Sequence, residues 1–208
     1  MYIFDFDDTL FNTQAFKHAR LQVLKKIGVS EELYKETYVK ARNDADGDFV
    51  YSDKRHAQMC ALHGIDEEKA YEALHSVTKR VKDFLFEDAI DVLGQVKKLG
   101  KPMILLSLGD PDYQEVKVKG SGIHDYFDRV FMVKRSKENV IKELLDSHKK
   151  QEPVWFINDK IEETQDIVSQ FPQLQVVLKV SKSYPIELYK ISGLPYVQTL
   201  KEFLSYDK

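Results

Sequence analysis

The sequence has little of several features that mark specialised classes of protein. Its 208 residues include one cysteine, Cys60, so no disulfide can form within the chain and nothing indicates an oxidising compartment. Glycine and proline, with 9 and 6 residues, stay close to average usage, and no tract is of low complexity. Collagen-like, mucin-like and disordered classes are therefore excluded.

Long hydrophobic runs and an excess of one charge are also missing. No apolar run approaches the ~20 residues of a membrane span, and aspartates occur early in the chain, where a signal peptide needs apolar residues. We therefore expect a cytoplasmic protein that binds no membrane. The 31 Lys and Arg residues against 34 Asp and Glu residues give no reason to expect a basic face, so nucleic acid is not an expected partner.

The hydrophobic residues, 43% of the chain, are enough for one large domain or a domain with an insertion. Apolar runs typical of buried strands occupy residues 2–4, 103–106, 130–133, 154–157 and 176–178, and a last short strand with a helix is expected within 196–204. From Asp88 onward the strands alternate with helical patterns, whereas residues 13–86 show helical spacing alone. This order predicts an α/β protein: a parallel sheet with helices on both faces, interrupted after its first strand by a helical insertion.

Polar residues follow the apolar runs, where a parallel sheet places its ligand sites. They are Asp5, Asp7, Asp8 and Thr9, then Ser107 and Leu108, then Lys134, Arg135 and Lys137, and finally Asn158 and Asp159. Asp5 and Asp7 lie two residues apart on extended chain, so their side chains point the same way, and a cation would offset their repulsion. With Asp159 as a third carboxylate they suit Mg²⁺, which takes oxygen ligands and often a phosphate. Lys137, Ser107 and the amides after it would then hold that phosphate.

These positions resemble the motifs of the haloacid dehalogenase (HAD) superfamily. The segment Phe4-Asp5-Phe6-Asp7-Asp8-Thr9-Leu10 is similar to its first motif, DxDx(T/V). Ser107, a lysine before a helix, and Asn158-Asp159 followed by Glu163 resemble the second, third and fourth motifs in the same order. The resemblance implies a Rossmann-like core formed by residues 1–13 and 87–208, with residues 14–86 forming an α-helical cap of the C1 type.

The resemblance also implies a role for each matching residue. Asp5 would be the nucleophile, and Asp7 would protonate the leaving oxygen and later activate water. Mg²⁺ would be held by the carboxylates of Asp5 and Asp159 and by the backbone carbonyl of Asp7, with Glu163 nearby. Ser107, Leu108 and Lys137 would bind the phosphate, and Lys134 is the second candidate for the lysine. Two positions depart from the family pattern: Asn158 stands where Gly or Asp is common, and Leu108 where many relatives have Asn.

We therefore expect a Mg²⁺-dependent phosphohydrolase that acts on a small phosphorylated metabolite through an aspartyl-phosphate. Asp7 favours this chemistry over dehalogenation, which has no leaving oxygen to protonate. A phosphomutase and a HAD-like protein that binds without turnover remain alternatives. In the insertion, the candidate substrate contacts are Arg42, Lys54, Arg55 and His56.

Overall fold

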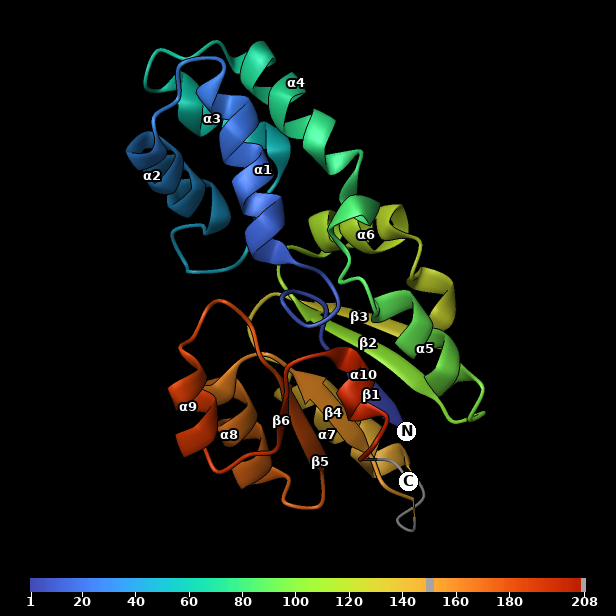
Figure 1. Cartoon of the computed structure of the whole chain (residues 1–208). Coiled ribbons are helices and arrows are strands. Elements are labelled where there is room, and N and C mark those ends of the chain that lie inside the picture. The colour runs from blue at the N-terminus through green and yellow to red at the C-terminus, as the bar shows by residue number, and fades with distance from the viewer. Residues whose placement is uncertain (149–151, 207–208) are drawn as a thin grey trace.

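The computed structural model describes residues 1–148 and 152–206, and their centre is a parallel sheet (Figure 1). The sheet has the strand order β3-β2-β1-β4-β5-β6. The strands are β1 (Tyr2–Phe4), β2 (Met103–Leu108), β3 (Arg129–Val133), β4 (Trp155–Asn158), β5 (Gln175–Lys179) and β6 (Tyr196–Val197). The first strand is central: Ile3 is in register with Ile104 of β2 on one side and with Phe156 of β4 on the other. The predicted parallel sheet is confirmed.

Helices cover both faces of the sheet because β1 alternates its side chains between two apolar cores. Tyr2 and Phe4 pack with α5 (Ala89–Lys97), α6 (Pro111–Ser121) and α10 (Leu200–Phe203). Ile3 points to the opposite face and packs with α7 (Glu138–Ser147) and α8 (Ile161–Gln170). Near the far edge, α9 (Ile186–Ile191) packs through Tyr189 against β5. A strand buried on both faces reads as a continuous apolar run, which is the pattern of residues 2–4.

The segment between β1 and α5 is helical, as its spacing predicts. It contains α1 (Thr13–Lys25), α2 (Glu31–Arg42), α3 (Asp53–Ala61), α4 (Glu67–Thr78) and the short 3-10 helix η1 (Val81–Phe84). Side chains of Asn12, Ser30, Ser52 and Asp66 accept hydrogen bonds from the first turns of α1 to α4 and so fix where these helices begin. These helices share an apolar core that includes Leu24, Tyr34, Cys60 and Leu74. We call α1 to α4 the helical segment.

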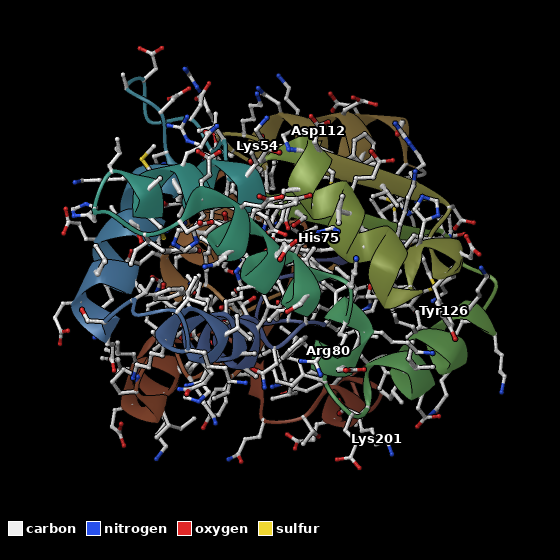
Figure 2. All side chains as sticks on the ribbon, turned by 90° about the horizontal axis from the view of Figure 1, so that it is seen from above. Lys54, His75, Arg80, Asp112, Tyr126 and Lys201 are labelled. Atoms are coloured by element: carbon white, nitrogen blue, oxygen red, sulfur yellow. The ribbon has the colours of Figure 1, made fainter. Side chains whose placement is uncertain are left out.

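The helical segment lies beyond the carboxyl ends of the strands, where the chain leaves β1 for α1 (Figure 1). Seen from above, it lies beside α6 (Figure 2), and the Tyr113 hydroxyl of α6 donates to Asp53 of α3 at 3.1 Å. Within residues 1–148 and 152–206, no helix combines the length and the apolar character needed to cross a bilayer.

Two helices, α6 and α9, have no counterpart in the sequence analysis, and α6 bears on the site. α6 follows β2 directly, yet its apolar residues show no amphipathic pattern, because Gln114 and Lys117 are buried while Val116 is about half exposed. A helix whose inward face is polar does not show the usual apolar stripe. The inward polar residues of α6 belong to the candidate active site.

Candidate active site

A tight loop after β1 fixes the first carboxylates. The Asp5 amide donates to the carbonyl of Ile157 at 2.9 Å, which continues the sheet by one residue. Asp8 then takes a left-handed backbone conformation with φ of 58°, a region that Asp enters more readily than most residues. The Asp8 carboxylate accepts from the backbone amide of Thr13 at 3.0 Å, and the buried rings of Phe6 and Phe11 stack beneath the loop. The loop therefore holds Asp5 and Asp7 at the carboxyl edge of the sheet.

Asp5 is 4% exposed and is held by two donors. Thr9 Oγ1 donates to Asp5 Oδ2 at 3.1 Å, and Lys137 Nζ donates to Oδ1 at 2.6 Å. Burial raises the pKa of Asp5, and the Lys137 ammonium acts in the opposite direction. These two contacts fix the position of the buried carboxylate at the edge of the sheet.

Lys137 is the lysine that reaches the site. It directly precedes α7, its side chain is fully buried, and it also donates to Glu163 Oε2 at 2.8 Å and to Asn158 Oδ1 at 3.3 Å. Lys134 is exposed. Asn158, which departs from the family pattern, donates through Nδ2 to Glu163 at 2.9 Å and so fixes Glu163 beside Lys137.

Asp159 carries the strongest sign of a cation site. Its Oδ1 is buried and has no hydrogen-bond partner among residues 1–148 and 152–206. Burial, together with the nearby Asp5 and Asp8 carboxylates, raises the pKa of Asp159 to about 8. Buried carboxylates that repel one another are stabilised by a cation, so these residues fit Mg²⁺. No three His, Cys, Asp or Glu side chains among the described residues form a ready metal cage, but Mg²⁺ commonly uses one or two carboxylates and several waters.

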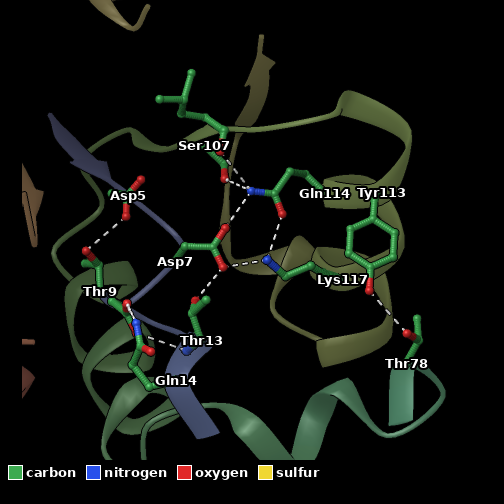
Figure 3. A network of polar contacts seen from close by, with 12 residues as sticks. Asp5, Asp7, Thr9, Thr13, Gln14, Thr78, Ser107, Tyr113, Gln114 and Lys117 are labelled. Carbon is green, nitrogen blue, oxygen red and sulfur yellow. Dashed lines mark hydrogen bonds and ion pairs between the residues drawn. The ribbon is translucent and has the colours of Figure 1, made fainter. Parts of the chain in front are cut away.

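Asp7 belongs to a second network, shown in Figure 3. Its Oδ1 accepts from Thr13 Oγ1 at 2.6 Å and from Lys117 Nζ at 2.5 Å, and its Oδ2 accepts from Gln114 Nε2 at 2.6 Å. Burial alone would raise the pKa of Asp7, but the Lys117 ammonium and these hydrogen bonds lower it to about 2. The sequence analysis missed Gln114 and Lys117. The only signal was their place in the stretch that follows β2.

Gln114 also connects Asp7 to the predicted phosphate-binding residues. Its Nε2 donates to Ser107 Oγ at 2.8 Å and to the carbonyl of Leu108 at 3.2 Å (Figure 3). The next residue is Gly109, where an added Cβ would come within 2.9 Å of the Gln114 side chain. Ser107 thus lies next to Asp7, and its hydroxyl accepts in this contact, which leaves its own proton able to donate.

A pocket of about 220 Å³ opens between the strand ends and the helical segment. Asp7, Asp8, Leu108 and Asp159 line it, whereas the more deeply buried Asp5 does not. Among the four candidate substrate contacts of the insertion, Arg42 is the one in its lining. The other three lie elsewhere: Lys54 is exposed, Arg55 donates to the carbonyl of Ala41, and His56 is buried between Thr37 and Tyr51.

The fold is thus a parallel α/β sheet that carries acidic residues at the carboxyl ends of its strands. The family model of the haloacid dehalogenase-like hydrolases matches residues 1–163, so the chain belongs to this family. No curated protein matches the chain.

Solved structures show the same Rossmann-like fold over nearly the whole chain. A haloacid dehalogenase-like hydrolase of Burkholderia xenovorans is 16% identical, with a TM-score of 0.74, and the match covers 99% of this chain and 95% of that one. The HAD hydrolase YfnB of Bacillus subtilis, described as bound to magnesium, is 14% identical with a TM-score of 0.63, over 99% and 96% of the two chains. The L-2-haloacid dehalogenase of Xanthobacter autotrophicus is 18% identical with a TM-score of 0.61, over 97% and 95%. At these identities the likeness concerns the fold alone.

Proposed function

We propose that the protein is a Mg²⁺-dependent phosphohydrolase that acts on a small phosphorylated metabolite through an aspartyl-phosphate on Asp5. One observation carries the proposal: Asp5, paired with Lys137, lies near Asp159, whose buried Oδ1 has no hydrogen-bond partner within the described part of the chain. Asp5 would be the nucleophile, the Lys137 ammonium is positively charged, and Asp159 has an unsatisfied carboxylate oxygen. This combination suits a negatively charged substrate that binds together with a metal ion. The carboxylates of Asp5 and Asp159 and the backbone carbonyl of Asp7 would hold Mg²⁺, which would offset the charge of the phosphoryl group.

Asp5 divides the reaction into two transfers. In the first, an Asp5 oxygen attacks phosphorus while the bond from phosphorus to the leaving oxygen breaks. In the second, water attacks phosphorus, the bond to Asp5 breaks, and the Asp5 carboxylate is restored with release of phosphate. Lys137 and the Ser107 hydroxyl would hold the phosphoryl oxygens, where charge accumulates during both transfers.

Asp7 handles the protons of both transfers. It would give a proton to the leaving oxygen in the first and accept one from water in the second. The contact with Lys117 favours the ionised form, which is the form required by the second transfer. Substrate entry must weaken that contact before Asp7 can protonate a poor leaving group.

The alternative functions require different chemical roles of these residues. Dehalogenation releases a halide and needs no proton donor, so neither Asp7 nor a metal ion would take part in that reaction. A phosphomutase shares the first transfer and returns the phosphoryl group to its own product. A protein that only binds would keep the pocket without turnover.

The test is phosphate release from 4-nitrophenyl phosphate and from a panel of phosphorylated metabolites, with and without Mg²⁺. We expect metal-dependent release in the wild type and none above background in Asp5→Asn. Asp125→Asn, which changes a fully exposed carboxylate, should behave as the wild type. Absence of release in all assays would refute the phosphohydrolase, and an isomerised sugar phosphate would identify a mutase.

A further inference from the structure

The two walls of the pocket differ in the charged groups that they carry. The wall formed by the strand ends and α6 carries four carboxylates and two lysines: Asp7, Asp8, Asp110, Asp159, Lys117 and Lys160. The part of the lining that comes from the helical segment and the loop after α2 contains no carboxylate and carries Lys17 and Arg42. A ligand that spans the pocket therefore meets a cation-binding wall at one end and a basic wall at the other.

Lys17 and Arg42 have no carboxylate partner among residues 1–148 and 152–206. Arg20, close by on α1, forms a buried ion pair with Asp53 at 2.8 Å. Lys17 and Arg42 lie instead over aromatic rings: Lys17 Nζ is 5.1 Å from the Tyr38 centroid, and Arg42 Cζ is 4.6 Å from the Phe49 centroid. Both are partly buried, so each loses some hydration without gaining a counter-charge. An anionic group of a ligand in the pocket would supply that charge.

Aromatic rings form a further part of the lining of the pocket. Phe16, Tyr38, Phe49, Tyr51 and Tyr113 all contribute to it. A cavity of ~150 Å³ accommodates a benzene molecule, so about 220 Å³ has room for one ring with a short substituent at each end. Aromatic walls favour a flat ring through stacked and edge contacts.

We propose that the substrate is a phosphate monoester whose leaving group is a single aromatic ring with a second anionic group, which Lys17 and Arg42 recognise. This inference rests on the proposed phosphohydrolase function. The phosphate lies at the acidic wall with the metal, the ring lies between the aromatic residues, and the second anion faces the helical segment. Lys17 and Arg42 thereby determine specificity and take no part in the chemistry.

Binding of two non-hydrolysable ligands tests this assignment separately from turnover. Calorimetry on the full chain with Mg²⁺ compares 4-carboxybenzylphosphonate with 4-carbamoylbenzylphosphonate, a neutral near-isostere at the second group. We expect the carboxylate to bind at least tenfold more tightly to the wild type, as a charge-assisted hydrogen bond allows. In Lys17→Gln/Arg42→Gln the preference should fall to within about twofold, while the affinity for the neutral ligand stays the same and shows that the pocket is intact.

Lys69→Gln is the matched control, because it removes an exposed lysine of α4 that lies outside the pocket lining. It should keep the full preference for the carboxylate. Equal binding of the two ligands by the wild type, or a preference that survives in the double variant, overturns the inference. Failure of the hydrolysis assay together with a preserved preference would refute the phosphohydrolase and leave the anion-binding wall in place.

Discussion

Lys134 and Lys137 both follow β3, and they differ in burial. The Lys137 side chain is fully buried against Asp5, whereas Lys134 points to solvent. We predict that Lys137→Gln lowers kcat by ~10²–10³, the cost of losing one donor to developing charge. The measurement is steady-state hydrolysis of 4-nitrophenyl phosphate, with circular dichroism to confirm folding.

Lys134→Gln is the matched control for that experiment, because it makes the same change three positions earlier on an exposed side chain. Its kcat should stay within about twofold of the wild type, because the exposed Lys134 side chain is not buried against Asp5 as the Lys137 side chain is. Equal losses in the two variants would show that Lys137 is not the lysine of the site.

Asp7 should matter most for substrates whose leaving group needs a proton. General acid catalysis is worth ~10²–10⁴ in rate, and it is lost in Asp7→Asn. We predict a loss of that size for an alkyl phosphate and a smaller one for 4-nitrophenyl phosphate, because nitrophenolate departs without a proton. Comparing kcat/KM for the two substrates in wild type and variant gives the result, and identical losses would argue against an acid role.

Among the helices, α6 shows where a sequence pattern stops being informative. The helices of the sheet faces and of the helical segment have apolar faces because each packs on an apolar core. α6 turns Gln114 and Lys117 inward to Asp7, so its buried side is polar apart from Val118. The carboxylates at the end of β1 were predictable, since the chain places them at the edge of a parallel sheet. Their partners on α6 were not, because only the fold brings residues over a hundred positions apart together.

α3 carries a buried histidine that should make stability depend on pH. His56 is fully buried, with its ring nitrogens 3.1 Å from Thr37 Oγ1 and 2.9 Å from the Tyr51 hydroxyl. Burial, reinforced by the nearby Arg20 charge, lowers the pKa of His56 to about 3 from its ordinary 6.5. Between pH 6.5 and pH 3, His56 is therefore protonated in the unfolded chain but neutral in the folded chain. The contribution of His56 to the free energy of unfolding thus falls as the pH decreases towards 3.

The expected loss from His56 is about 2 kcal/mol between pH 7 and pH 5, since each pH unit below 6.5 is worth about 1.4 kcal/mol. Urea unfolding at the two pH values should show this difference in the wild type but not in His56→Gln, after the changes common to both chains are subtracted. His63→Gln, at a histidine whose side chain is 33% exposed, should keep the wild-type difference. A His56→Gln variant with an unchanged pH dependence would contradict the assignment.

For the molecule as a whole, local patterns were enough to predict the sheet, the helical segment and the strand-end carboxylates. Strands buried on both faces read as apolar runs, and each strand carries its polar residues to the same edge. The residues that line the pocket could be predicted less well from the sequence. Arg42 was one of four candidates in the insertion, and only its position over Phe49 in the lining separates it from Lys54, Arg55 and His56. Which residues face the substrate depends on how the helical segment packs on the strand ends. The residue spacing within the helical segment alone does not predict this packing.

The acidic edge of the sheet should make the stability of the whole chain depend on Mg²⁺. A ligand that binds only the folded state stabilises it by about 2.7 kcal/mol at a hundred times its Kd, which for a chain of this size is a rise in Tm of ~5–10 °C. We predict that rise for the wild type on passing from EDTA to saturating Mg²⁺ at matched ionic strength. In Asp159→Asn the rise should fall below ~2 °C, and the Tm in EDTA should exceed that of the wild type, because a neutral amide replaces a buried carboxylate repelled by Asp5 and Asp8.

Asp112→Asn, at an exposed position on α6, should respond to Mg²⁺ as the wild type does. A wild-type Tm indifferent to Mg²⁺, or an Asp159→Asn variant that gains as much as the wild type, would show that this edge does not hold the ion.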